Sequence, residues 1–198
     1  MITHMKYKHL FTFGSAMIVA WVFGTFLFIY FWPHIMYNHY EKAILVEGFG
    51  DGPIPVNTLY AEPLASQSDS SSNLMTTGVN RDTLLTVGWL DLSKGPQVLH
   101  VPDMAGRYYS VQFTDRSDGT DFAYVGTRTT GTQAGDYLIT GQGWKGTVPS
   151  GMPHAAKRQS TPNNSMLVIG RVLVYSDSDL PTAYGLAKLI QLAALSSK

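Results

Sequence analysis

The most strongly apolar part of the chain lies near its N-terminus. Residues 10–32, LFTFGSAMIVAWVFGTFLFIYFW, contain no charged side chain. As an α-helix this segment extends over roughly 34 Å, enough to cross a hydrocarbon core of about 30 Å. A core helix of a soluble domain normally keeps a polar face, which these residues lack. The pattern therefore predicts a transmembrane helix over residues 10–32.

A cleaved secretory signal is the main alternative, because a basic start followed by an apolar run also describes such a signal. The run is longer than the usual apolar region of about 7–15 residues, and it continues into YFWPH instead of a small-residue cleavage site. We therefore expect an uncleaved signal anchor. Lys6 and Lys8 precede the span, whereas Glu41 and Lys42 after it offset each other. By the positive-inside rule, residues 1–9 are cytoplasmic and the rest of the chain lies outside.

Aromatic residues cluster around the C-terminal end of the predicted span, as they do at membrane interfaces. The expected interface belt consists of Tyr30, Trp32, Tyr37 and Tyr40. Residues 33–64 form a juxtamembrane segment, in which the turn cluster GDGP at 50–53 prevents the anchor helix from continuing. Residues 65–78 are polar and rich in serine, which predicts a flexible surface loop.

Short alternating runs follow this loop. In residues 107–114, Tyr109, Val111 and Phe113 fall on one face of a strand and polar side chains on the other. Further strands are predicted at 83–89, 98–101, 122–128 and 136–140. Residues 166–175 are apolar on both faces apart from one glycine and one arginine, so this strand is expected at the centre of a sheet covered on each side.

The last element is predicted to be a helix over residues 182–195. Asp179 and Pro181 are suited to its start, and leucine, isoleucine and alanine gather on one face. This helix is expected to pack on its own domain, on a partner protein or on the membrane. Together the elements predict an all-β fold: an antiparallel β-sandwich or jelly-roll-like domain over residues 79–198, with a transmembrane helix before it and a helix at its end.

Composition narrows the chemistry further. The 198 residues carry 14 basic and 14 acidic side chains and no cysteine. Balanced charge does not indicate a nucleic-acid partner, and the lack of cysteine excludes disulfides and thiolate metal sites.

The segment GQGWKG at 141–146 matches the glycine spacing of a dinucleotide-binding loop. Such a loop must open a helix, because the N-terminal amides of that helix hold the pyrophosphate. The following residues, TVPSGMP, contain two prolines and a glycine and do not sustain a helix. We therefore expect no nucleotide and interpret the segment as a turn between strands, with Trp144 packed down.

Other candidate chemistry is weakly indicated. The stretch DRSDGTD at 115–121 has the composition of a calcium loop without the spacing of one, and a hairpin turn is the simpler interpretation. His100 is expected to point outward from its strand. No catalytic residue, metal ligand or cofactor is predicted.

Arginines within the predicted strands are the remaining candidates. A strand arginine that faces a core must find a carboxylate or a carbonyl, and structural ion pairs are the first explanation. An anion-binding pocket on the sheet is the second. The possible anion or ligand contacts are Arg107, Arg128 and Arg171, together with Asp82 and Trp144.

Ordered motifs within the same region resemble a known family. They are NRDTL at 80–84, WLDL at 89–92, VPD at 101–103, GRYY at 106–109, QFTD at 112–115, YVGTRTTG at 124–131, GDY at 135–137, GWKG at 143–146 and GR at 170–171. The sequence is similar to the family of domains of unknown function numbered 1254, over roughly residues 79–175. The motif residues expected to be structural are Asn80, Asp82, Asp91, Gly143, Trp144 and Gly146.

The resemblance implies a β-sandwich and no established reaction. Members often carry a second domain of unknown function numbered 1214, or form tandem pairs in which each half has its own membrane helix. This chain resembles the short, anchored, single-domain form. We therefore expect an inner-membrane protein with a periplasmic domain that acts as an accessory or interaction subunit. Its expected partners are the bilayer and another membrane protein, either a companion 1214-type protein or a larger envelope complex. The alternative is a periplasmic ligand-binding or hydrolytic domain for envelope sugars or an anionic small molecule.

Overall fold

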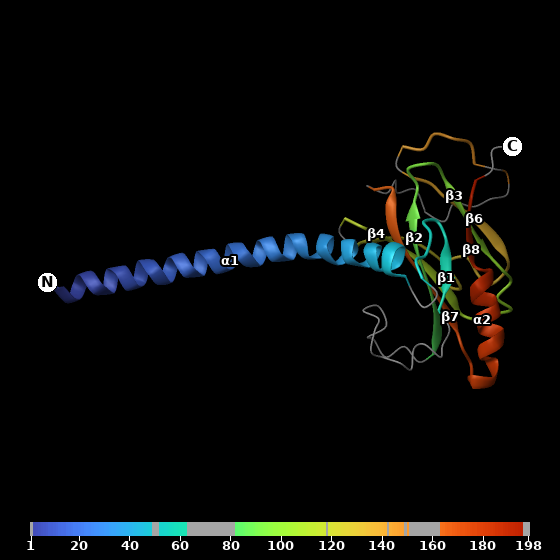
Figure 1. Cartoon of the computed structure of the whole chain (residues 1–198), viewed down its shortest axis with the longest axis horizontal. Helices are drawn as coiled ribbons and strands as arrows, with labels where there is room; N and C mark the ends of the chain where they lie inside the picture. Colours follow the sequence, from blue (N-terminus) through green and yellow to red (C-terminus); the bar gives the residue numbers. More distant parts are fainter. Residues whose placement is uncertain are drawn as a thin grey trace.

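The computed structural model describes residues 2–48, 52–62, 82–117, 119–141, 143–148, 150 and 163–195. Asn80 and the predicted polar loop at 65–78 lie outside these ranges. The described chain forms one long N-terminal helix and a mostly antiparallel β domain that ends in a short helix and a strand (Figure 1).

The helix α1 spans Ile2–Lys42, ten residues beyond the predicted end of the span, with Pro33 inside it. Its apolar side chains are exposed, as at Phe13, Trp21 and Phe26, where 65–73% of the residue is accessible. It is long and apolar enough to cross a membrane by length and composition, a test that a signal sequence near the N-terminus also passes.

The C-terminal end of α1 continues into one wide helical turn, η1, at Ala43–Glu47. The helix stops at Gly48, two residues before the predicted turn cluster, because Gly48 adopts a φ of +80° that favours glycine. A β-carbon there would lie 2.0 Å from the backbone of Gly52, so only glycine allows the chain to turn back this closely.

The larger sheet has five antiparallel strands in the order β1-β2-β7-β4-β5. Their bounds are Leu59–Ala61, Thr83–Asp91, Ser165–Leu173, Tyr109–Asp115 and Asp121–Gly126. Four of the five follow the predicted runs, and β7 lies at the centre as its apolar faces predict. The short strand β1 was not predicted.

The smaller sheet has the order β6-β3-β8, with β6 at Gly135–Ile139, β3 at Gln97–Val101 and β8 at Gln191–Ala194. The prediction of a helix over residues 182–195 is wrong in its bounds. The helix α2 spans Leu180–Leu189, and the chain then becomes extended at Ile190. Four residues of β8 pair with Gln97–His100 of β3, so a tertiary ladder outweighs the local helix propensity.

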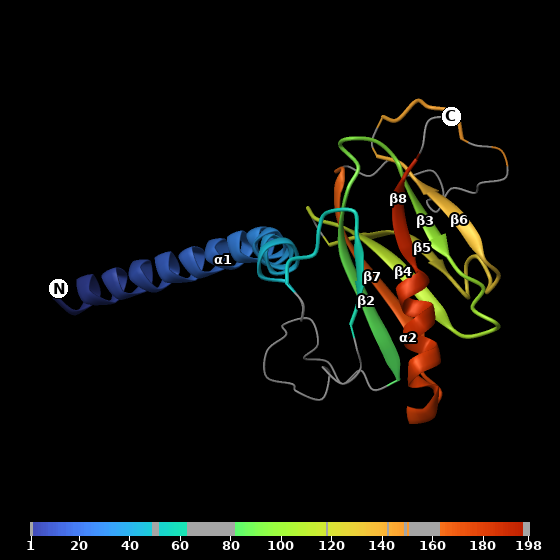
Figure 2. The ribbon, with the colours of Figure 1, turned by 45° about the vertical axis from the view of Figure 1, so that its right-hand side comes forward.

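One hydrophobic core contains side chains from both sheets and from α2. Tyr109, Val111 and Phe113 of β4 are fully buried in it, as their alternation predicts. The smaller sheet contributes Leu99 and Ile139 to the same core. Figure 2 shows α2 and β8 on the side of the domain that faces away from α1.

A second, smaller core covers the opposite face of β2 and β7. Ile44 of η1 packs there with Val87, Trp89 and Leu167, and Ile54 completes the buried set. The C-terminal end of α1 and η1 therefore cover part of the larger sheet, which explains why β7 is apolar on both faces.

The predicted membrane-interface belt divides into two parts. Tyr37 and Tyr40 pack against the second core, so their contacts are with the domain. Tyr30 and Trp32, one to two turns earlier, remain 67% and 46% exposed on α1.

Candidate functional site

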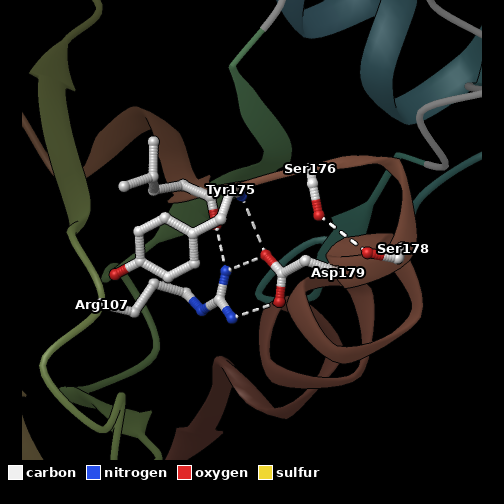
Figure 3. A network of polar contacts seen from close by, with 6 residues as sticks. Arg107, Tyr175, Ser176, Ser178 and Asp179 are labelled. Carbon is white, nitrogen blue, oxygen red and sulfur yellow. Dashed lines mark hydrogen bonds and ion pairs between the residues drawn. The ribbon is translucent and has the colours of Figure 1, made fainter.

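Arg107 lies in a polar network between the segment that precedes β4, the end of β7 and the start of α2 (Figure 3). It is 7% exposed and forms a bidentate pair with Asp179, with Nη1–Oδ2 and Nη2–Oδ1 distances of 2.5 and 2.7 Å. Nη1 also donates to the carbonyl of Leu173 at 2.6 Å, and the guanidinium lies 4.7 Å from the ring centre of Tyr175. Both terminal nitrogens of Arg107 donate to acceptors within the fold, as expected of a structural ion pair.

The same network lowers the pKa of the Asp179 carboxyl to about 2. The hydrogen bonds from Arg107 are the main cause, and the backbone N–H of Tyr175, which donates to Oδ2 at 2.9 Å, adds to it. The pair joins the segment that leads into β4 to the start of α2, across 72 residues of sequence.

A pH dependence of stability follows from this pair. The pKa of Asp179 in the folded state lies below its ordinary value of about 4. The ionised carboxylate therefore adds to the free energy of unfolding above pH 4, and this stabilisation is lost as the pH falls towards 2. We expect Asp179→Asn to be less stable than the natural chain at pH 5, with a difference that narrows between pH 4 and pH 2. Urea unfolding of both proteins across this range measures it, and a constant difference would contradict the assignment.

Arg128 and Arg171 lie on the outer face of the larger sheet, opposite the main core. Arg171 is opposite Ser110 on β4, in line with Ile169 and Leu167 of the second core. The guanidinium of Arg128 lies 5.8 Å from the ring centre of Tyr108. In the described part of the chain neither arginine has a carboxylate within ion-pair distance, in contrast to Arg107.

A small cavity of about 200 Å³ lies beside Arg128, between Tyr108 and Tyr124. The hydroxyl of Tyr124 donates to Oδ2 of Asp121, which raises the pKa of this tyrosine to about 12. Oδ1 of Asp121 accepts from Gln112 and Thr114, both at 2.6 Å. These hydrogen bonds from Gln112, Thr114 and Tyr124 to Asp121 order the outer face of the sheet beside this cavity.

Asp82 and Trp144 are the other predicted contact residues. Asp82 is exposed just before β2, and its carbonyl accepts from the backbone of Val174 at 2.8 Å, next to Leu173, whose carbonyl accepts from Arg107. Trp144 follows β6, and a β-carbon on Gly146 would lie 2.3 Å from its ring. Gly143 has a φ of +73°, and residues 143–148 form a turn and irregular chain without a helix.

The acidic stretch at 115–121 joins β4 to β5 as a hairpin, as predicted. The backbone N–H of Asp115 donates to Thr120 at 2.9 Å, and Oδ1 of Asp115 accepts from Ser117 and Asn163. No cluster of three potential metal ligands occurs among the described residues. His100 is exposed, as expected, and lies 2.7 Å from Asp136 on the neighbouring strand.

A larger cavity, of about 740 Å³, lies between the C-terminal end of α1 and the ends of β2, β7 and β4; we call it the juxtamembrane cavity, after the predicted juxtamembrane segment at 33–64. Its residues come from α1 and η1, the ends of β2 and β4, and the start of β7. They are His34, Asn38, Glu41, Leu45, Val56, Trp89, Asp91, Ser93, Arg116, Ser117, Asn163, Asn164 and Ser165.

Arg116 joins the two walls of this cavity. Its Nη2 donates to Oδ1 of Asn38 at 2.5 Å and lies 3.0 Å from Oε2 of Glu41. Sequence reasoning did not predict this cavity. The one available signal was the spacing of His34, Asn38, Glu41 and Leu45, which places them on one face of a helix.

These features define a small antiparallel β domain at the end of a long apolar helix, with one cavity between the helix and the domain and a smaller one beside Arg128. Residues 56–194 match the family described as Protein of unknown function (DUF1254). The chain belongs to this family, as its ordered motifs indicate.

The crystal structure of the VPA0106 protein from Vibrio parahaemolyticus has a similar fold, with a TM-score of 0.64 and 26% sequence identity. The match covers 85% of this chain and 37% of that one, so this chain corresponds to a little over a third of the Vibrio protein. A search of curated proteins found no match.

Proposed function

We propose that this chain is a single-pass inner-membrane protein whose periplasmic β domain acts as an accessory or interaction subunit of an envelope complex. The observation that supports this proposal most directly is the packing of the outer end of α1 on the domain. A helix whose apolar side chains are exposed over residues 12–32 needs lipid or protein around it. A domain packed on the end of such a helix has a defined orientation relative to the membrane.

The connection between α1 and the domain has apolar and polar parts. Ile44 is fully buried against Trp89 and Leu167, and Arg116 reaches back to Asn38 and Glu41. A flexible tether would hold the domain near the membrane in any orientation. A packed connection suits a subunit that presents one face to a fixed neighbour, and it supports an interaction role over that of a freely diffusing enzyme.

The far side of the domain offers the surface for such a neighbour. We infer that the two sheets form a sandwich, because their side chains share one core. Tyr175 and Leu189, at the two ends of the α2 region, are 64% and 51% exposed. The partner in this proposal is another membrane protein, either a companion 1214-type protein or a larger envelope complex.

Three measurements test the proposal. Extraction of membranes with alkaline carbonate is expected to leave the full chain in the pellet, and a label on His100→Cys is expected to react with an impermeant maleimide from the periplasm. The absence of native cysteine makes this label specific. A photo-crosslinker at Leu189 is expected to capture one discrete membrane protein, and the same group at Lys94 serves as the control. A chain released by carbonate, or a monomer without crosslinks at either position, would reject the proposal.

Arg128 and Arg171 support a second candidate function, the binding of an anionic small molecule. Both arginines lie on the outer face without a carboxylate partner among the described residues, and Tyr108 and Tyr124 flank the cavity beside Arg128. Arginine without a protein partner is suited to carboxylate or phosphate ligands. Loss of binding in a folded Arg128→Gln protein would distinguish this function from a purely structural role.

A further inference from the structure

We propose that the juxtamembrane cavity binds a neutral polyhydroxylated group, such as a saccharide. Ligand sites are typically concave and enclose about 300–1,000 Å³. The cavity measures about 740 Å³ and lies where α1 meets the ends of three strands. Its walls come from segments far apart in sequence that the second core and Arg116 hold together.

The lining favours hydrogen bonding without strong charge. Hydroxyl and amide side chains predominate: Asn38, Ser93, Ser117, Asn163, Asn164 and Ser165. An amide provides both donors and acceptors, and a hydroxyl does the same, which matches the alternating donor and acceptor groups of a polyol. Trp89, which is buried in the second core, supports one wall from behind, and its Nε1 donates to Oγ of Ser165 at 2.8 Å, which holds this hydroxyl in place.

Charge argues against the other small-ligand classes. The cavity contains two carboxylates, Glu41 and Asp91, and one arginine, Arg116. Glu41 and Asn38 already hold Arg116, so an anion would meet unbalanced negative charge. A divalent cation would need a cluster of ligating side chains, and none occurs in the described ranges.

Hydrogen-bonding capacity remains available at the walls. The amide nitrogen of Asn38 and Oδ2 of Asp91 have no partner in the part of the chain that the structure describes. In both side chains the other polar atom is engaged, Asn38 Oδ1 by Arg116 and Asp91 Oδ1 by the backbone of Ser93 at 2.8 Å. One donor and one acceptor are therefore held in place for a ligand.

The position of the cavity allows two sources for the polyol. Its first lining residue on α1, His34, follows Trp32 by two residues, or about 3 Å along a helix. A glycolipid headgroup and a free saccharide therefore both have access. The lipid source rests on the proposed membrane span, whereas the free saccharide does not depend on it.

Binding is tested on the full chain in a zwitterionic detergent, because alkyl glycoside detergents would compete for the site. Maltose and lactose are the free probes, observed by saturation-transfer NMR. Phosphatidylcholine nanodiscs with added glucosyl diacylglycerol provide the lipid probe, with retention measured by native mass spectrometry after release from the disc. A signal from either disaccharide identifies a free saccharide site, and retention of the glycolipid alone identifies a headgroup site.

Occluding variants locate the binding. Ser93→Trp places an indole in the cavity, and Val56→Trp does so from a different segment of the lining. Each is expected to reduce the signal at least tenfold, whereas Ser178→Trp, in the exposed 3-10 turn at Asp177–Asp179 before α2, is expected to leave it unchanged. The proposal would be overturned if none of the three probes bound. It would also be overturned if Ser93→Trp and Val56→Trp were both folded and both kept the full binding signal. Carbonate extraction of the same protein reports separately on the membrane span.

Discussion

Replacement of Arg107 by methionine is expected to lower the free energy of unfolding by about 2 kcal/mol. The change removes the cation opposite Asp179 and the donor to the carbonyl of Leu173, at a position that is only 7% exposed. Asp179 is partly exposed, so water compensates its lost partner in part, whereas the carbonyl of Leu173 loses this donor outright. Urea unfolding of the full chain in detergent, followed by circular dichroism, measures the effect.

Arg128→Met is the matched control, because Arg128 is an exposed arginine whose recorded contact is the ring of Tyr108. Its stability is expected to stay within about 0.5 kcal/mol of the natural chain. The double change Arg107→Met with Asp179→Leu is expected to recover part of the loss, since it replaces both charges by apolar groups. Equal effects of Arg107→Met and Arg128→Met would show that the ion pair does not stabilise the fold.

Truncation of Ile44 to alanine is expected to weaken the packing of α1 on the domain by about 3 kcal/mol. Ile44 is fully buried against the outer face of β2 and β7, and its carbonyl accepts from the backbone of Ile54 at 3.0 Å. The main core lies on the opposite face, so the domain is expected to stay folded while its orientation on α1 becomes variable. Spin labels at His39→Cys and Lys94→Cys report this as a broader distance distribution.

Val46→Ala is the control within the same helical turn, because Val46 is 62% exposed. Its distance distribution is expected to remain as narrow as that of the natural chain. If Ile44→Ala also left the distribution narrow, the second core would not determine the orientation of the domain. The proposal of an oriented interaction subunit would then lose its main support.

Most strands of this protein are predictable from local patterns. Alternation placed β4, β3, β6 and β5 within two residues at either end, because burial of every second side chain requires that period. The central place of β7 followed from its two apolar faces. The strand β1 has three residues, too few to show a period, and β8 has the leucine and alanine content of a helix.

The candidate site was less predictable. The sequence indicated that the strand arginines need partners, and this was correct for Arg107. Its partner, Asp179, lies 72 residues away and was assigned a different role, as a residue suited to the start of the final helix. The juxtamembrane cavity escaped prediction because its walls come from α1, β2, β4 and β7, which no local pattern connects.

The apolar helix, the approximate positions of six strands and the buried face of β4 can be predicted from local patterns alone. These features depend on the spacing of apolar residues along a short stretch, which burial imposes directly. The strand order, the change from helix to strand at Ile190, the pairing of Arg107 with Asp179 and the contact between η1 and the larger sheet become visible in the folded structure alone. Each of these depends on the free energy of contacts between distant segments, which competes with local preference and is not visible within either segment alone.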